Sequence, residues 1–140
     1  MDKTPNILLT NDDGINSPGL WAIAESLTGV GQVTVVVPDR DQSGTGASMT
    51  LVKPLAIEVV ESRIKGVSET YTVGGTPADC VILAAEHLHG GSIDLIVSGI
   101  NQGANLGLDV FNSGTFGAAL HGDFLSLIHI SEPTRLGMIS

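Results

Sequence analysis

The sequence is poor in basic residues, aromatic residues and cysteine, and each shortage excludes a class of protein. Its 140 residues include 6 Lys and Arg against 15 Asp and Glu, which gives a formal net charge of −9. A protein that coats a nucleic-acid duplex or an anionic membrane needs a basic surface, so we expect neither partner. The single cysteine, Cys80, cannot form a disulfide within the chain, and we expect a reducing, cytoplasmic compartment.

The chain also lacks long apolar runs and the commonest nucleotide-binding motifs. Residues 1–5 do not begin a signal peptide, and no apolar stretch approaches the roughly 18 residues of a membrane-spanning helix. Neither a Walker A loop nor a Gly-x-Gly-x-x-Gly turn follows the first expected strand. A length of 140 residues with 42% hydrophobic content indicates one folded domain whose core rests on aliphatic side chains.

The pattern of apolar residues predicts an α/β domain with a mostly parallel sheet and helices on both faces. Short apolar runs rich in β-branched residues predict buried strands at 6–10, 32–38 and 93–97. Ser or Thr followed by Pro predicts helix starts at Ser17 and Thr76, and a third helix is expected from about Ser113 to Gly122. Weak alternation predicts a hairpin between residues 55–61 and 69–73.

Polar, glycine-containing loops follow each of the three buried strands. They cover residues 11–14, 38–44 and 98–105. In a parallel sheet these loops would all lie at the edge formed by the carboxyl ends of the strands, where open α/β sheets bind their ligands. The sequence therefore predicts one site assembled from three distant segments.

Two adjacent carboxylates, Asp12 and Asp13, stand in the first of these loops. Carboxylates about 4 Å apart repel each other by on the order of 4 kcal/mol at an effective dielectric constant near 20. Gly14 would let the chain turn so that both side chains reach one cation, and oxygen ligands favour Mg²⁺ or Mn²⁺ over zinc. The alternative is a solvated turn that caps the following helix, and the two neighbouring loops make the metal site the preferred interpretation.

Two segments could bind an anion. The small, hydroxyl-rich run 43–48 could hold phosphate oxygens with its backbone N–H groups. The helix start at Ser113-Gly114-Thr115 would offer free N–H groups and the positive end of a helix dipole. Taken singly, these segments are also typical of a flexible loop and of an ordinary capped helix.

The other chemically reactive or aromatic residues are expected to be structural or solvated. Cys80 and Trp21 are predicted to pack in the core, and His87 and His89 to face solvent. His121 could approach the site from the third helix, although a structural role is the preferred interpretation.

The same loops resemble, in order along the chain, the motifs of the survival protein SurE family. The matching segments are Asn11-Asp12-Asp13-Gly14 with Ser17-Pro18-Gly19, Pro38-Asp39-Arg40 with Gln42-Ser43-Gly44, Gly75-Thr76-Pro77-Ala78-Asp79-Cys80, Ser98-Gly99-Ile100-Asn101-Gln102-Gly103-Ala104-Asn105-Leu106-Gly107, and Ser113-Gly114-Thr115. Five ordered motifs over about 120 residues make the resemblance specific.

The resemblance implies a Rossmann-like, three-layer α/β/α fold and a metal-dependent phosphatase, a 5′-nucleotidase acting on nucleoside monophosphates. It implies one divalent ion, Mg²⁺ or Mn²⁺, held by Asp12, Asp13, Ser43 and Asn101. It also implies that the phosphate lies near Asn11, Gly44, Asn105, Ser113, Gly114 and Thr115. Members of the family are typically cytoplasmic dimers or tetramers.

The expected mechanism is metal-assisted hydrolysis in which Asp12 and Asp13 anchor the ion and a water attacks phosphorus. A direct Asp nucleophile is less favoured, because the metal needs both carboxylates. The rival interpretations are a nucleotide-binding module without catalysis and an inactive gene fragment.

The resemblance covers roughly the N-terminal half of a family member, and it fails near Asp123. The family often has Tyr where this chain has Asn112, and an acidic residue where it has His121. We assign residues 1–124 to the N-terminal part of a SurE-like domain and residues 125–140 to a non-native tail, because 125–135 resembles a translated sequencing adapter. A chain without the family's remaining strands is expected to be marginally stable or to aggregate through an open sheet edge.

Overall fold

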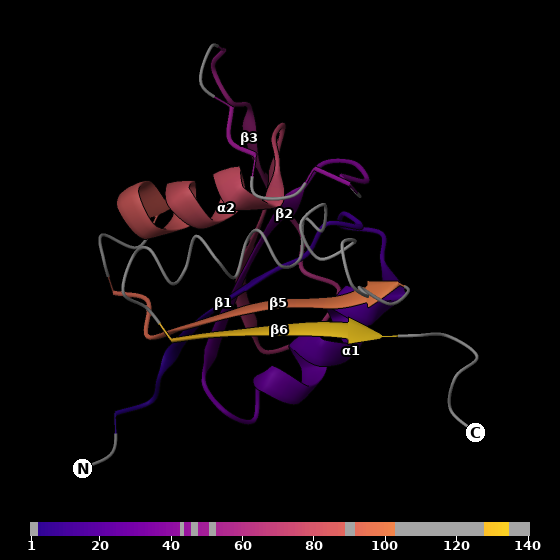
Figure 1. Cartoon of the computed structure of the whole chain (residues 1–140). Helices are drawn as coiled ribbons and strands as arrows, with labels where there is room; N and C mark the ends of the chain where they lie inside the picture. The colour runs from indigo at the N-terminus through magenta and orange to yellow at the C-terminus, as the bar shows by residue number, and fades with distance from the viewer. Residues whose placement is uncertain are drawn as a thin grey trace.

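A sheet forms the framework of the protein in a computed structural model, and within the described residues one α-helix lies on each of its faces (Figure 1). The structure describes residues 3–42, 44–45, 48–50, 53–88, 92–102 and 128–134, with the backbone alone for 101, 102 and 128–134. The elements, in chain order, are β1 (Asn6–Thr10), α1 (Pro18–Leu27), β2 (Gln32–Pro38), β3 (Ile57–Val60), β4 (Val67–Val73), α2 (Pro77–Leu83), the π-helical turn η1 (Ala84–Leu88), β5 (Leu95–Gln102) and β6 (Ile128–Thr134).

The six strands form one sheet in the order β3-β4-β2-β1-β5-β6. All neighbouring pairs are parallel except β3 with β4, which form the antiparallel hairpin expected from the sequence. The predicted α/β class with a mostly parallel sheet is therefore confirmed. The central position of β1, between β2 and β5, brings together segments that are far apart in the sequence.

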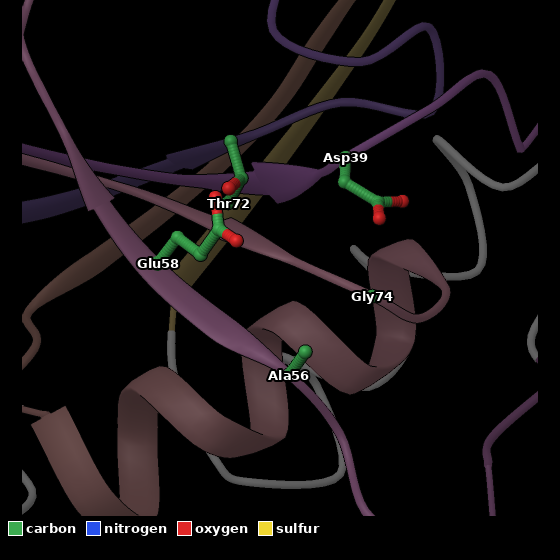
Figure 2. A pocket seen from close by; sticks show the side chains of 5 residues that line it. All are labelled: Asp39, Ala56, Glu58, Thr72 and Gly74. Carbon is green, nitrogen blue, oxygen red and sulfur yellow. The ribbon is translucent and has the colours of Figure 1, made fainter.

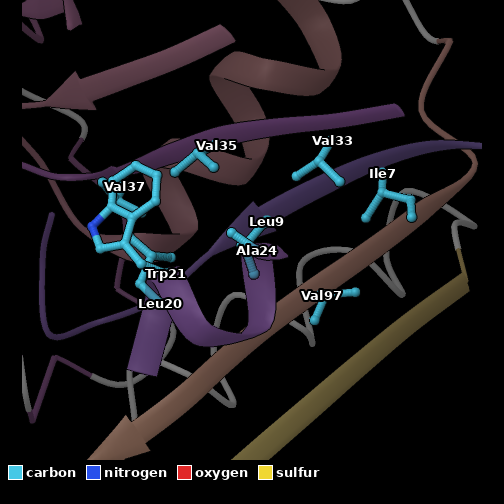
Figure 3. Close-up of a cluster of buried hydrophobic side chains, with 9 residues drawn as sticks. All are labelled: Ile7, Leu9, Leu20, Trp21, Ala24, Val33, Val35, Val37 and Val97. Carbon is cyan, nitrogen blue, oxygen red and sulfur yellow. The ribbon is translucent and has the colours of Figure 1, made fainter. Parts of the chain in front are cut away.

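Alternation along the buried strands divides the core into two layers. Ile7 and Leu9 of β1 face α1, and they join Leu20, Trp21 and Ala24 of that helix in one apolar cluster, which also contains residues of β2 and β5 (Figure 3). Leu8 of β1 points to the opposite face and packs in a second cluster with Cys80 and Val81 of α2. Successive strand residues point to opposite faces, so continuous apolar runs were the correct signal for a doubly covered sheet.

The two helices begin where the Ser-Pro and Thr-Pro pairs predicted, but only one start has a side-chain cap. Thr76 accepts a hydrogen bond from the N–H of Asp79, and the Asp79 side chain accepts one from the N–H of Thr76, which completes a capping box. Ser17 occupies the N-cap position of α1 without capping through its side chain. Its buried hydroxyl has no hydrogen-bond partner within the described part of the chain.

Three features differ from the sequence prediction. β5 covers Leu95–Gln102 rather than 93–97, because the parallel partner β6 continues the pairing beyond Ser98. β6 itself lies in the segment assigned to a foreign tail. α2 continues into the π-helical turn η1, which apolar periodicity does not distinguish from an α-helix. The expected third helix lies outside the described residues.

Trp21 and Cys80 are buried, and His87 is exposed, as expected. The indole Nε1 of Trp21 donates a 2.7 Å hydrogen bond to the carbonyl of Ile15, which fixes the loop before α1. The guanidinium of Arg63 lies 5.7 Å from the centroid of the same ring. His89 and His121 lie outside the described residues. Of the helices in the described ranges, none has the length and apolar character needed to cross a membrane.

Candidate metal and phosphate site

The three strands expected to build the site are neighbours in the sheet and run in the same direction. In the parallel registers, Leu9 pairs with Val35 of β2 and Thr10 pairs with Ser98 of β5. The chain therefore leaves β1 directly beside the last residues of β2 and alongside the second half of β5. The first two loops therefore leave the sheet side by side, as predicted, whereas residues 98–102 continue β5 instead of beginning a third loop.

The loop after β1 is built around the side chain of Asn11. Asn11 is fully buried; its Nδ2 donates to the carbonyl of Gly14 at 3.0 Å, and its Oδ1 accepts from the N–H of Gly14 at 3.1 Å. Gly14 has a φ of +89°, a conformation that side chains disfavour. The amide of Asn11 thus closes the turn that carries the two aspartates, and its predicted contact with phosphate stays a prediction.

Asp12 and Asp13 differ in exposure. Asp12 is 3% exposed, whereas Asp13 is half-buried. The carbonyl of Asp12 accepts a 2.7 Å hydrogen bond from the N–H of Gln42, in the loop after β2. This bond joins the first and second loops next to the carboxylate pair. The bond joins backbone groups alone, so it does not depend on the side chain of either residue.

The second loop contributes Gly44, which has a φ of +85° and open space around the position a Cβ would take. An exposed glycine with this geometry leaves its backbone accessible to a ligand. Ser43, the predicted metal ligand beside it, lies outside the described residues. Arg40 precedes these residues and forms an ion pair with Asp39, with 3.1 Å between Nε and Oδ1, which raises the pKa of its guanidinium.

The third segment is a strand where the sequence predicted a loop. Asn101 lies within β5 and is paired in register with Pro133 of β6. The backbone of Asn101, which is all that the structure describes of this residue, lies on the strand that neighbours β1. The remaining predicted phosphate contacts, Asn105, Ser113, Gly114 and Thr115, also lie outside the described residues.

The donor set suits a hard dication rather than zinc. The predicted ligands offer carboxylate, hydroxyl and amide oxygens, which are the atoms that Mg²⁺ and Mn²⁺ prefer. Within the residues that the structure describes, no three His, Cys, Asp or Glu side chains gather into a metal cluster. A site of two carboxylates completed by neutral oxygens would contain too few of these residue types to form such a cluster, and the ion at Asp12 and Asp13 stays a prediction.

A small cavity of about 60 Å³ lies beyond the second loop, toward the β3–β4 hairpin (Figure 2). Asp39, Glu58 and Thr72 line it together with Ala56 and Gly74. Figure 2 shows Glu58 next to Thr72, with Asp39 set apart toward the end of β2. Small-molecule sites usually measure about 300–1,000 Å³, so this cavity suits water rather than a nucleotide.

Sequence reasoning missed one long-range contact, between Asp79 and Thr50. Asp79 is 3% exposed, and it accepts hydrogen bonds from Thr50 as well as from Thr76. The Thr-x-x-Asp spacing signals the cap, but the contact with Thr50 spans 29 residues and has no local signal. Cys80, which follows Asp79, is buried, and desolvation raises the pKa of its thiol above the usual range. That thiol is therefore a core group and a poor nucleophile.

Comparison with known proteins identifies what the chain resembles. The family model described as "Survival protein SurE" matches residues 7–131. The chain is 55% identical over 132 residues to "5'-nucleotidase SurE" of Dehalococcoides mccartyi (strain CBDB1), covering 93% of this chain and 49% of that protein. It is 47% identical over 125 residues to "5'-nucleotidase SurE 1" of Thermus thermophilus, covering 89% and 49%.

Among solved structures, the crystal structure of the SurE protein from Aquifex aeolicus superimposes with a TM-score of 0.82 at 42% identity. The match covers 96% of this chain and 54% of that one. The chain thus spans about half the length of the curated relatives it matches.

Proposed function

Because the chain belongs to the survival protein SurE family, we propose that it carries the metal- and phosphate-binding half of a phosphatase. The enzyme would hydrolyse nucleoside monophosphates to nucleoside and phosphate, as a 5′-nucleotidase does. One observation carries the proposal most directly. The buried Asp12 and its neighbour Asp13 lie at the edge where three parallel strands meet, and the Asp12 carbonyl joins their loop to the loop after β2.

We propose that Asp12, Asp13, Ser43 and Asn101 hold one divalent ion, Mg²⁺ or Mn²⁺. When bound, such an ion neutralises phosphate charge and lowers the pKa of a water molecule. The backbone turn closed by Asn11 would keep the two carboxylates on one side of the loop. The buried position of Asp12 strengthens its attraction to a cation, since screening by water is weaker there.

The phosphate would be held by neutral groups, because the chain has few cations to offer. The backbone N–H of Gly44 is accessible, and Asn11, Asn105 and the Ser113-Gly114-Thr115 segment are the further donors that we propose. Fixed N–H dipoles aimed at the phosphoryl oxygens stabilise the charge that grows during in-line attack. We further propose a cytoplasmic location, assembly into homodimers or tetramers, and no duplex nucleic-acid or membrane partner.

Release of inorganic phosphate from a nucleoside 5′-monophosphate tests the activity. We expect release with Mn²⁺ or Mg²⁺ and none after EDTA. Nucleotide binding without release, at any metal concentration, would contradict the phosphatase and support the non-catalytic binding module. Activity that EDTA leaves unchanged would contradict the metal's role.

A further inference from the structure

Asp79, in the first turn of α2, has more hydrogen bonds than a helix cap requires. Its Oδ2 accepts from the N–H of Thr76 at 2.9 Å, which is the capping contact. Its Oδ1 accepts from the N–H of Thr50 at 2.8 Å, and its Oδ2 also accepts from the hydroxyl of Thr50 at 2.7 Å. A carboxylate that is 3% exposed needs such donors to offset the loss of water. Two of these three hydrogen bonds are donated by Thr50, which lies outside the helix.

The cap residue Thr76 reaches the same segment. Its hydroxyl accepts from the N–H of Asp79 at 3.1 Å and donates to the carbonyl of Ser48 at 2.6 Å. Three hydrogen bonds therefore connect the start of α2 to residues 48–50. These residues lie in the connection between β2 and β3, which the structure describes again at residues 53–56.

A cavity lies between this segment and α2. It measures about 200 Å³, and Thr50 and Asp79 line it together with the apolar side chains of Met49, Leu55, Ile82 and Leu83. Met49 is 42% exposed. Within the described residues, the hydrogen bonds of Asp79 and Thr76 join residues 48–50 to the helix across this gap.

The turn before α2 is shaped to admit the Asp79 carboxylate. A Cβ at Gly75 would lie 2.5 Å from Asp79 Oδ2 and 2.9 Å from Leu55 Cδ2. Real Cβ atoms do not approach other atoms so closely, so a larger residue at position 75 would displace the carboxylate.

The opposite end of the loop is fixed as well. The N–H of Gln42 bonds to the carbonyl of Asp12, and the N–H of Thr45 bonds back to Gln42 at 3.2 Å. The N–H of Ser48 then bonds to the carbonyl of Thr45 at 3.2 Å. The described residues on either side of Gly44 are thus held by the Asp12 backbone at Gln42 and by the Asp79 carboxylate at Thr50.

We propose that Asp79 is a positioning residue of the candidate site: its carboxylate holds residues 48–50, so that the chain between Gln42 and this segment presents Gly44 beside Asp12 and Asp13. The effect of Asp79 on ligand binding rests on the proposed function, because that function supplies the ligand. The effect of Asp79 on residues 48–50 depends only on contacts within this chain. Asp79 touches neither ion nor phosphate and acts through Thr50.

The first test replaces Asp79 with Asn in the 140-residue chain. An amide cannot accept from all three donors, because its Nδ2 would face an N–H or hydroxyl donor. We expect amide exchange, resolved by NMR, to become about 10-fold faster or more at Thr45, Ser48 and Thr50, with β1 and β2 unchanged. Mn²⁺ affinity, measured by EPR of the free ion, should fall by about 10-fold or more, as it does when groups supporting metal ligands are removed.

Asp94→Asn is the matched control. Asp94 also accepts from a backbone N–H, that of Asn6 at 2.8 Å, but at the start of β1, the opposite edge of the sheet. The control should change neither loop exchange nor Mn²⁺ affinity. Equal effects in the two variants would overturn the proposal.

A second pair of variants decides the question if Asp79→Asn does not fold. Thr50→Val removes the hydroxyl donor and keeps the backbone N–H, whereas Thr50→Ser keeps both. We expect the Thr50→Val variant to show faster amide exchange at Ser48 and position 50 and weaker Mn²⁺ binding. The Thr50→Ser variant should keep the wild-type exchange rates and Mn²⁺ affinity. Identical exchange rates and Mn²⁺ affinities in Thr50→Val and Thr50→Ser would overturn the proposal that Asp79 holds residues 48–50. Unchanged amide exchange in a folded Asp79→Asn variant would overturn it as well. If the wild-type chain neither binds Mn²⁺ nor releases phosphate, the proposed function fails, and the exchange rates alone decide the anchoring.

Discussion

At Asp12, the contribution of the side chain to metal binding can be separated from the contribution of the backbone to folding. Its backbone carbonyl bonds to Gln42, so the loop contact does not depend on the charge of its side chain. Asn has nearly the same shape as Asp but lacks the negative charge that a dication needs. The variant Asp12→Asn should therefore keep the fold and lose the metal.

We expect Asp12→Asn to lower Mn²⁺-dependent phosphate release by on the order of 100-fold or more, because several kcal/mol of charge stabilisation is lost with the ion. Circular dichroism should show an unchanged spectrum. Glu25→Gln, an exposed carboxylate on α1, is the control and should retain full activity. Near-normal turnover by Asp12→Asn would remove the proposed mechanism.

Burial of Cys80 makes the free energy of unfolding depend on pH in the alkaline range. Desolvation raises the pKa of its thiol, the nearby Asp79 charge acts in the same direction, and contact with the Thr10 hydroxyl opposes both. In the unfolded chain the thiol ionises near its ordinary pKa of about 8.5, whereas in the folded chain it stays protonated. The stability from the neutral thiol is complete below that value and is lost as pH rises above it, by up to about 1.4 kcal/mol per pH unit.

Urea unfolding at pH 7.5, 9 and 10 measures this effect. The free energy of unfolding should fall more steeply above pH 9 in the wild-type chain than in Cys80→Ala, which has no thiol to ionise. The comparison of slopes removes the contributions of Tyr and Lys, which both proteins share. Parallel slopes would show that Cys80 ionises as easily in the folded state as in the unfolded state.

At the scale of the elements, the sequence predicts what local chemistry determines. β1 and β2 have the predicted bounds, because uninterrupted Val, Ile and Leu can only be buried in a doubly covered sheet. The extension of β5 depends on pairing with β6, which no local pattern encodes. The bond between Asp79 and Thr50 depends in the same way on a contact 29 residues away.

For the candidate site, the meeting of the first two loops could be predicted from strand order and direction alone, whereas residues 98–102 form a strand in place of the expected third loop. The side-chain contacts within it could not, since they depend on turns that long-range packing fixes. Asn11 illustrates this: the sequence suggests a phosphate contact, and the structure shows its amide closing the turn on Gly14. The ligand sets around Ser43 and Asn101 stay predictions.

The two helix starts should respond differently to the loss of a hydroxyl. Thr76→Ala removes the cap and the bond to Ser48, and a lost cap typically costs about 1 kcal/mol. Ser17→Ala removes a buried hydroxyl that does not cap α1, so its effect should stay within about 0.5 kcal/mol. Urea unfolding of both variants measures the difference. An equal cost would indicate that the Ser17 hydroxyl bonds to a group outside the described residues.

At the scale of the whole molecule, the boundary near residue 124 can be tested on the source DNA. The segment 125–135 resembles a translated adapter, yet the family match runs to residue 131 and residues 128–134 pair with β5 as β6. A seven-residue parallel strand needs only a compatible apolar pattern, so pairing does not decide the origin of the segment. We expect independent sequencing of the source DNA to show different codons after about residue 124. Reads that carry the same codons through Ser140 would contradict the proposal.

Metal binding should also change the stability of the whole molecule. A ligand that binds only the folded chain stabilises it by about 2.7 kcal/mol at 100 times its dissociation constant, which raises the Tm by several degrees. With a formal charge of −9, the chain also gains stability from simple screening of its own repulsion, so the control must match ionic strength. We expect MnCl₂ to raise the Tm more than NaCl of equal ionic strength, and EDTA to reverse the rise. Asp12→Asn should respond to the two salts alike. An equal response to MnCl₂ in both proteins would mean that Mn²⁺ acts on the general charge rather than on a site at the sheet edge.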